Sequence, residues 1–284
     1  MTEENIKAMT PLTLEELKEP LTAAEGQEMD NPHFICQLNM FIEAVNNIPN
    51  LSKYHRYCLT EQQRDHVKQR TSVYQAIREN PDIANVNIDP VVIIGLPRSG
   101  TTMLHRLLSC DRRFVAPMAF ELLQPCPPGR PENWTGTERY RKAQEYISHV
   151  FPGGVDRISH MHEIKMDLPD ECQHTLQAAM MEAGWSFHPA FKKLKEFIHM
   201  DTGDNSVEAY KYYKNALKCI FYEGLENGEV PLLKAPNHTL HIDTYKKVFP
   251  NAKFIFPYRN TKEMVGSGVS LFGKARCKTN AIRS

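Results

Sequence analysis

The chain has 284 residues, of which 41% are hydrophobic, so it can bury a substantial core. It carries 34 Lys and Arg residues and 34 Asp and Glu residues. The resulting formal net charge of zero excludes a global basic field for nucleic acid, and we expect no nucleic-acid partner. No run of 18 apolar residues occurs, so we also expect no membrane span.

The seven cysteines are scattered along the chain and form no Cys-x-x-Cys pair. The start of the chain is polar and acidic and shows no signal peptide. We therefore expect reduced thiols and a cytoplasmic location. The cysteines and histidines also lack the spacing of a metal site, so we expect no metal.

Residues 1–87 have the pattern of a helical region. Thr13 and Glu16 have capping-box spacing ahead of a helical turn. Apolar residues recur at helical spacing over 34–45, and Asn80-Pro81 is a stop signal. We expect this region to pack on the rest of the chain within one domain.

Four short apolar segments are expected to be β-strands, with helical patterns between them. The first, 91–94, is apolar at every position, as in a strand that is buried on both faces of a parallel sheet. The others lie at 113–118, 230–234 and 253–257. Strands that alternate with helices predict an α/β fold with a P-loop-type parallel sheet flanked by helices.

The α/β unit is expected to span 88–284 and to contain a mostly helical insert over about 137–227. Aromatic residues of the insert, among them Trp185, Tyr210, Tyr212 and Tyr213, are candidates for a ligand pocket. Their helical spacing is more typical of core positions. Helices are also expected over 101–108, 240–249 and 261–272.

The first predicted strand runs into GLPRSGTT, a loop with phosphate-binding glycine spacing between Gly95 and Gly100. A strand, a turn and a helix in this order point several backbone N–H groups and the positive end of the helix at one anion. A triphosphate-binding loop would carry a lysine after Gly100, where this chain has Thr101. Arg98 offers instead a bidentate partner for phosphate or sulfate. The loop therefore predicts a phosphate-type ligand without γ-phosphate chemistry.

A second basic residue follows the fourth predicted strand. Arg259 lies beyond its carboxyl end, where open α/β sheets bind ligands. Ser267 lies eight residues further on, about two turns into a predicted helix. A strand-end arginine alone is more often a surface charge. Together with the loop, Arg259 and Ser267 predict a site for a further phosphate.

These two motifs resemble those of the sulfotransferases that use 3′-phosphoadenosine 5′-phosphosulfate (PAPS). GLPRSGTT resembles their 5′-phosphosulfate loop, and RNTKEMVGS resembles their 3′-phosphate motif. The block from LLKAPNH to FIFPYRN, together with DLPDE at Asp167–Glu171, resembles the broad branch of bacteria and many animals. The likeness covers about residues 30–272. It assigns donor binding to Pro97, Arg98, Ser99, Gly100, Thr101, Thr102, Arg259 and Ser267.

The resemblance implies in-line sulfuryl transfer from PAPS to the hydroxyl or amine of a small-molecule or carbohydrate acceptor, with no metal. It assigns Lys234 to the sulfuryl or leaving-phosphate oxygens and Arg98 to charge on the bridging oxygen. Many cytosolic members carry Lys in place of Arg98, and the arginine form resembles the tyrosylprotein and carbohydrate branches. Two residues are candidate bases for the acceptor's proton, Glu121 and His238, with Glu121 slightly preferred and a structural role open for each.

Two other functions stay open. A P-loop nucleotide kinase or other triphosphatase would share the architecture, but the absent lysine and the lack of a clear strand-end Asp for Mg²⁺ count against it. Family members usually continue beyond the 3′-phosphate helix, whereas this sequence stops at Ser284 with a polar tail. A truncated, non-catalytic sulfotransferase-like binding protein is therefore the other alternative.

Overall fold

The computed structural model describes residues 11–19, 21, 31–48, 51–130, 133–150, 164–181, 204–226 and 228–269. It contains a four-stranded parallel sheet with the strand order β2-β3-β1-β4. The strands are β1 (Val91–Ile93), β2 (Phe114–Val115), β3 (Val230–Lys234) and β4 (Lys253–Ile255). All four predicted strands are therefore present, although β2 has only two residues, and the predicted α/β fold is confirmed.

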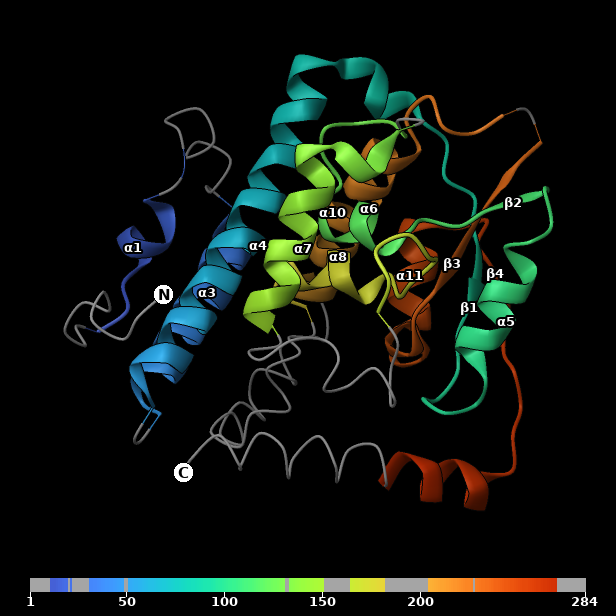
Figure 1. The fold of residues 1–284 in the computed structure, drawn as a ribbon. Coiled ribbons are helices and arrows are strands. Elements are labelled where there is room, and N and C mark those ends of the chain that lie inside the picture. Colours follow the sequence, from blue (N-terminus) through green and yellow to red (C-terminus); the bar gives the residue numbers. More distant parts are fainter. Residues whose placement is uncertain are drawn as a thin grey trace.

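The central strand β1 is apolar at every position because its two faces meet different helices. Ile93 packs in a cluster with Leu104 of α5 (Thr101–Leu108). The adjacent Val92 packs in a larger cluster with Tyr245 of α11 (Ile242–Val248). Figure 1 shows α5 on one side of the sheet and α11 and α10 (Asp204–Phe221) on the other. Such a strand has no solvated face, which explains its continuous apolar run.

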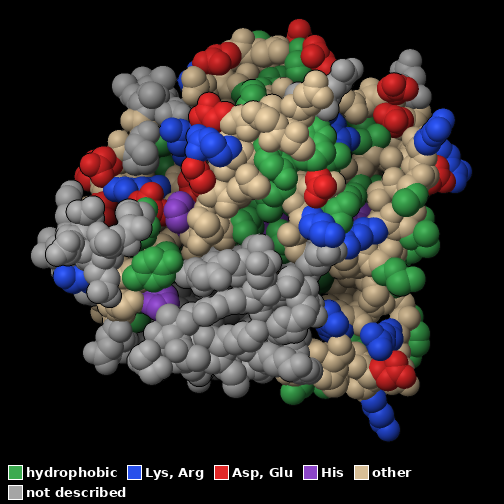
Figure 2. Space-filling view, viewed as in Figure 1, with side chains coloured by type: hydrophobic (Ala, Val, Ile, Leu, Met, Phe, Trp, Pro, Cys, Tyr) green, Lys and Arg blue, Asp and Glu red, His purple; other side chains and the backbone are tan. Residues whose placement is uncertain are grey.

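Helix α5 forms a single layer over its side of the sheet. Its outward side chains Met103 and Leu107 are 76% and 63% exposed. Figure 2 shows apolar side chains gathered on this face of the molecule. The amino-terminal end of α5, at Thr101, follows directly from the exposed residue Gly100, so a ligand can reach it from solvent.

The described part of the N-terminal region is largely helical, as predicted. It comprises α1 (Leu14–Lys18), α3 (Pro32–Asn46) and α4 (Lys53–Glu79). The hydroxyl of Thr13 accepts a hydrogen bond from the backbone N–H of Glu16, which confirms the predicted helix start. The apolar stripe of α3 is buried, through Phe34, Leu38, Phe41, Ile42 and Val45.

Helix α4 links the N-terminal helices to the rest of the molecule. Arg56 forms an ion pair with Glu16 of α1. On other turns of the helix, His66 Nε2 lies 2.7 Å from the hydroxyl of Tyr146, and Gln69 donates to the carbonyl of Leu122. The helix is capped by Asn80, where the sequence predicts its end.

The remaining described elements are η2 (Pro81–Asn85), α6 (Ala119–Leu123), η3 (Trp134–Gly136), α7 (Glu138–Val150), α8 (Gln173–Gln177) and η7 (Pro236–Leu240). They pack in or against the large cluster or, for α7 and η3, in a separate apolar cluster with α6. Residues 261–269 are also helical, while 270–272 and Trp185 lie outside the described residues. Tyr210, Tyr212 and Tyr213 are fully buried, which confirms their core interpretation. No described helix is both long and apolar enough to cross a membrane.

The helix predicted over 240–249 is correct only in part. The chain first makes a 3-10 turn over Pro236–Leu240, and the α-helix begins at Ile242. His241, with φ of −130°, separates the two. A continuous apolar pattern hid this break, because periodicity reports the buried face and not the backbone path.

The buried face of α3 provides the first testable prediction. Leu38 has no exposed surface, and we expect Leu38→Ala to lower the free energy of unfolding by about 3 kcal/mol through lost burial and a residual cavity. The neighbouring Asn39 is exposed, so Asn39→Ala is the matched control. Urea denaturation of both variants measures the difference. Equal midpoints for both would show that α3 does not contribute to the cooperative core.

Candidate functional site

The loop after β1 has the backbone of a tight anion-binding turn. Gly95 and Gly100 adopt φ of 130° and 94°, a region that side chains rarely occupy. Arg98, which is not a glycine, also has a positive φ of 73°. Such a residue is uncommon, and strained backbone of this kind is concentrated at functional sites. The Ser99 hydroxyl donates to the carbonyl of Leu96 and stabilises the turn.

A residue that sequence reasoning missed holds the start of this loop. The hydroxyl of Thr239, in η7, accepts a hydrogen bond of 2.8 Å from the backbone N–H of Gly95. The two residues are far apart in sequence, and no motif pointed to Thr239. The contact ties the loop to the chain that leaves β3.

The structure brings the two predicted phosphate motifs into direct contact. The guanidinium of Arg98 donates through Nε to the hydroxyl of Ser267 at 2.9 Å. The guanidinium of Arg259 donates to the backbone carbonyl of Arg98 at 3.1 Å and also forms an ion pair with Glu263. Arg98 and Arg259 are both exposed side chains. Two cationic groups are therefore available to an anion at the carboxyl ends of β1 and β4.

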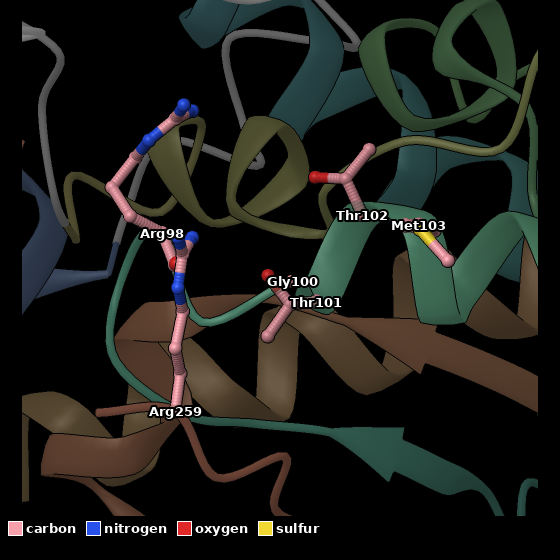
Figure 3. Close-up of a pocket in the computed structure, with 6 residues that line it drawn as sticks. All are labelled: Arg98, Gly100, Thr101, Thr102, Met103 and Arg259. Atoms are coloured by element: carbon pink, nitrogen blue, oxygen red, sulfur yellow. The ribbon is translucent and has the colours of Figure 1, made fainter. Parts of the chain in front are cut away.

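A pocket of about 160 Å³ lies between these motifs. Figure 3 shows Arg98 and Arg259 on one side of it, Thr102 and Met103 on the other, and Gly100 and Thr101 between them. This volume is several times the space of one water, about 30 Å³, so a phosphate or sulfuryl group fits. The amino-terminal end of α5 adds positive potential to the two guanidinium groups. Of the other predicted donor-binding residues, Pro97 is exposed in the loop and does not line the pocket.

Lys234 lies beneath the pocket rather than in its wall. It is the last residue of β3, and its side chain is fully buried. Its Nζ lies 3.4 Å from the hydroxyl of Thr102, which lines the pocket. The same Nζ lies 2.7 Å from a carboxylate oxygen of Glu171. The sequence placed Lys234 near the donor, and the structure connects it to the loop helix through Thr102.

Glu121 is engaged in a buried ion pair. Its carboxylate accepts from Nε and Nη2 of Arg130 at 2.7 and 3.0 Å, and also from the backbone N–H of Met118. The side chain is 1% exposed, against 22% for Arg130. In this arrangement Glu121 stabilises the start of α6, which is the structural role that the sequence left open.

His238, the other candidate base, is also fully buried. Its Nδ1 lies 2.7 Å from the hydroxyl of Tyr210 on α10, and its Nε2 has no described partner. Burial, with a smaller contribution from His241, lowers the pKa of His238 to about 3. The imidazole is therefore neutral at physiological pH, and it packs among the aromatic rings of α10 and α11.

The ion pair of Glu121 gives a second prediction. Glu121→Ala leaves a mostly buried guanidinium without its carboxylate, and we expect a loss of about 3 kcal/mol in the free energy of unfolding. The control is Glu145→Ala, which removes a half-exposed carboxylate paired with Arg141 and should change stability by less than about 0.5 kcal/mol. Urea denaturation compares the two. Equal stability of Glu121→Ala and Glu145→Ala would show that the ion pair between Glu121 and Arg130 does not stabilise the fold.

The parallel sheet and the two phosphate motifs at its edge fit a sulfotransferase, and comparison with known proteins gives the same family. The model of the sulfotransferase family matches residues 90–283, which include β1, the loop, Lys234 and Arg259. The match covers more than half of the chain, and the chain belongs to the sulfotransferase family.

Two curated relatives of the chain are mycobacterial. The chain is 24% identical over 183 residues to the omega-hydroxy-beta-dihydromenaquinone-9 sulfotransferase Stf3 of Mycobacterium bovis and to that of Mycobacterium tuberculosis. These alignments cover 64% of this chain and 45% of each relative, so the chain matches about half the length of these proteins.

Two solved structures share the fold. The crystal structure of sulfotransferase STF9 from Mycobacterium avium has a TM-score of 0.73 at 21% identity and covers 94% of this chain and 68% of that one. For sulfotransferase STF1 from Mycobacterium tuberculosis H37Rv the values are 0.67, 17%, 96% and 81%.

Proposed function

We propose that this sulfotransferase uses PAPS as its donor and transfers the sulfuryl group to a small-molecule acceptor. The observation that carries the proposal is the contact between the two motifs. Arg259 and Ser267 both bond to Arg98, so the 3′-phosphate motif and the loop form one continuous cationic site. A donor with phosphate at both the 3′ and 5′ positions of one nucleoside needs two anion sites that are adjacent.

The loop supports a sulfuryl donor over a nucleoside triphosphate. A triphosphate site places a lysine after the second glycine, where it bridges the β- and γ-phosphates. Thr101 occupies this position and is buried. The cations near the pocket are Arg98, Arg259 and, one layer deeper, Lys234. They suit a donor with a single 5′-phosphosulfate.

In the proposed reaction the acceptor oxygen or nitrogen forms a bond to sulfur while the bond from sulfur to the bridging phosphate oxygen breaks. Negative charge grows on that leaving oxygen, and the N-terminus of α5, Arg98 and Lys234 stabilise it. The acceptor's proton must pass to a base. Glu121 and His238 remain the two candidates, although both are buried and hydrogen-bonded in this structure.

The mycobacterial relatives are named for a hydroxylated menaquinone derivative. A small molecule with a free hydroxyl group is therefore the acceptor class that we would screen first. An amine acceptor would need the same loss of one proton and stays within the proposal.

Titration calorimetry with 3′-phosphoadenosine 5′-phosphate (PAP) and with Mg²⁺-ATP tests the donor. We expect PAP to bind in preference to ATP, and Arg259→Ala to weaken PAP binding about 10- to 100-fold through loss of charge-assisted hydrogen bonds. Lys253→Ala, an exposed change at the first residue of β4 and outside both phosphate motifs, is the control and should leave the affinity unchanged. Preference for ATP would contradict the proposal and favour a nucleotide kinase. Binding of neither would favour a non-catalytic protein.

A further inference from the structure

Lys234 has a buried ion-pair partner that belongs to neither phosphate motif. The carboxylate of Glu171 lies 2.7 Å from Nζ of Lys234, and the two side chains are 11% and 0% exposed. Burial of an ammonium group is costly unless a counter-charge accompanies it. Among the described residues, Glu171 is the acidic residue for which an ion pair with Lys234 is observed. Glu171 therefore supplies the counter-charge for the buried ammonium group of Lys234.

The backbone around Glu171 is held in place against β3. The N–H of Cys172 donates to the carbonyl of Lys234 at 2.9 Å, and the N–H of Lys234 donates to Sγ of Cys172 at 3.2 Å. The N–H of Glu171 donates to the carboxylate of Asp170 at 2.7 Å. These bonds fix the position from which the Glu171 side chain reaches Lys234. Glu171 thus offers a preorganised carboxylate rather than a mobile one.

The other contact of the ammonium points toward the pocket. Nζ of Lys234 lies 3.4 Å from the hydroxyl of Thr102, in the first turn of α5, and Thr102 lines the pocket. The neighbouring His105 is buried, and burial, with the charge of Lys234, lowers its pKa to about 4. His105 is therefore neutral at physiological pH and does not compete with Lys234 for the carboxylate. Glu171, Lys234 and Thr102 therefore form a series of contacts that ends at the pocket.

We propose that Glu171 is a positioning residue for sulfuryl transfer, which holds the charged Lys234 beside Thr102 and acts on the donor only through Lys234. The inference rests on the proposed function, because it requires that the pocket binds PAPS. It adds a residue that lies outside both phosphate motifs and is not among the residues that line the pocket.

A double-mutant cycle on PAPS affinity tests this role. Calorimetry compares the parent with Glu171→Gln, Lys234→Met and the double variant. We expect each single change to weaken PAPS binding about tenfold, the size of one charge-assisted hydrogen bond. The double variant should also be about tenfold weaker, and not a hundredfold, because Glu171 has no effect once Lys234 is absent. Additive losses would show that Glu171 acts independently of Lys234 and would overturn the proposal.

Two further variants keep the result interpretable. Glu171→Asp retains the charge on a shorter side chain, so its PAPS affinity should lie between those of the parent and Glu171→Gln. If Glu171→Gln folds poorly, Glu171→Asp is compared with the parent alone. Asp167→Asn removes an exposed carboxylate from the same segment and should bind PAPS like the parent. A parent that binds PAPS together with an unaffected Glu171→Gln contradicts this inference alone. A parent that binds neither PAP nor PAPS contradicts the proposed function and this inference with it.

Discussion

Replacing Lys234 with methionine is expected to lower the rate of sulfuryl transfer about 100- to 1,000-fold, the usual cost of one preorganised charge at a site of developing negative charge. Methionine fills a similar volume at the end of β3, where Lys234 is fully buried, but it leaves the Glu171 carboxylate without its partner, so rates are compared per folded molecule. The loss in turnover should exceed the tenfold loss in donor affinity, because Arg98 and Arg259 still bind the donor while the charge of Lys234 is missing from the transition state. The rate is measured as the formation of PAP when the sulfuryl group of PAPS passes to an acceptor or to water.

The matched control for this prediction is Lys253→Met. Lys253 is the first residue of β4, is exposed, and carries the same charge on the same sheet. Its replacement should leave the rate within about twofold of the parent, since a solvated charge contributes little. Equal rates for Lys234→Met and the parent would remove Lys234 from the transfer step. A Lys253 effect as large as that of Lys234 would point to general electrostatics instead.

The second large effect is expected in acid. His66 and His238 have pKa values lowered to about 3, and His105 has one lowered to about 4, in each case chiefly by burial. Between these values and the unfolded value near 6.5, the unfolded chain binds protons that the folded chain does not. Stability is therefore fully present above about pH 6.5 and falls as the pH decreases. Each histidine adds a slope of about 1.4 kcal/mol per pH unit, so the three together remove about 4 kcal/mol between pH 7 and 5.5.

Urea denaturation at several pH values between 7 and 5 measures this slope. His105→Gln should reduce it by about a third, since one of the three proton-excluding sites is gone. His33 is exposed, so His33→Gln should leave the slope as it is in the parent. A midpoint that does not change from pH 7 to pH 5 would show that these histidines are not buried in neutral form.

The sequence was most informative where one local rule acts alone. The apolar run at Val91, the cap at Thr13 and the stop at Asn80 each have one physical reading, and the structure confirms all three. The loop was predicted from its glycine spacing between a strand and a helix, and Arg259 from its strand-end position taken together with that loop, because parallel strands present their carboxyl ends to one edge. The contact between Arg98 and Ser267 is the direct consequence.

Pair partners were harder to predict, because they depend on tertiary packing. Glu121 was recognised as a candidate base, but nothing in the sequence indicates that Arg130 closes over it. Glu171 is part of the DLPDE segment, but nothing in that segment indicates its ion pair with Lys234. The pair forms because the segment runs beside the end of β3. Thr239 lies within the block from LLKAPNH to FIFPYRN, but nothing in the sequence indicates its bond to Gly95. Side-chain partners distant in sequence follow from the fold and not from local pattern.

Helix α4 has a consequence for how the molecule unfolds. The helix has 27 residues and is about 40 Å long. Its side chains bond to Glu16 of α1, to Tyr146 of α7 and to the carbonyl of Leu122 in α6. Cleavage of the connection between Glu79 and Val91 would therefore not give two fragments that fold independently. Each fragment alone would lack the contacts that α4 makes with α6 and α7. We expect the N-terminal helices and the sheet to melt in a single transition. A proteolytic nick there should lower the melting temperature of the whole molecule rather than divide it into two independently stable parts.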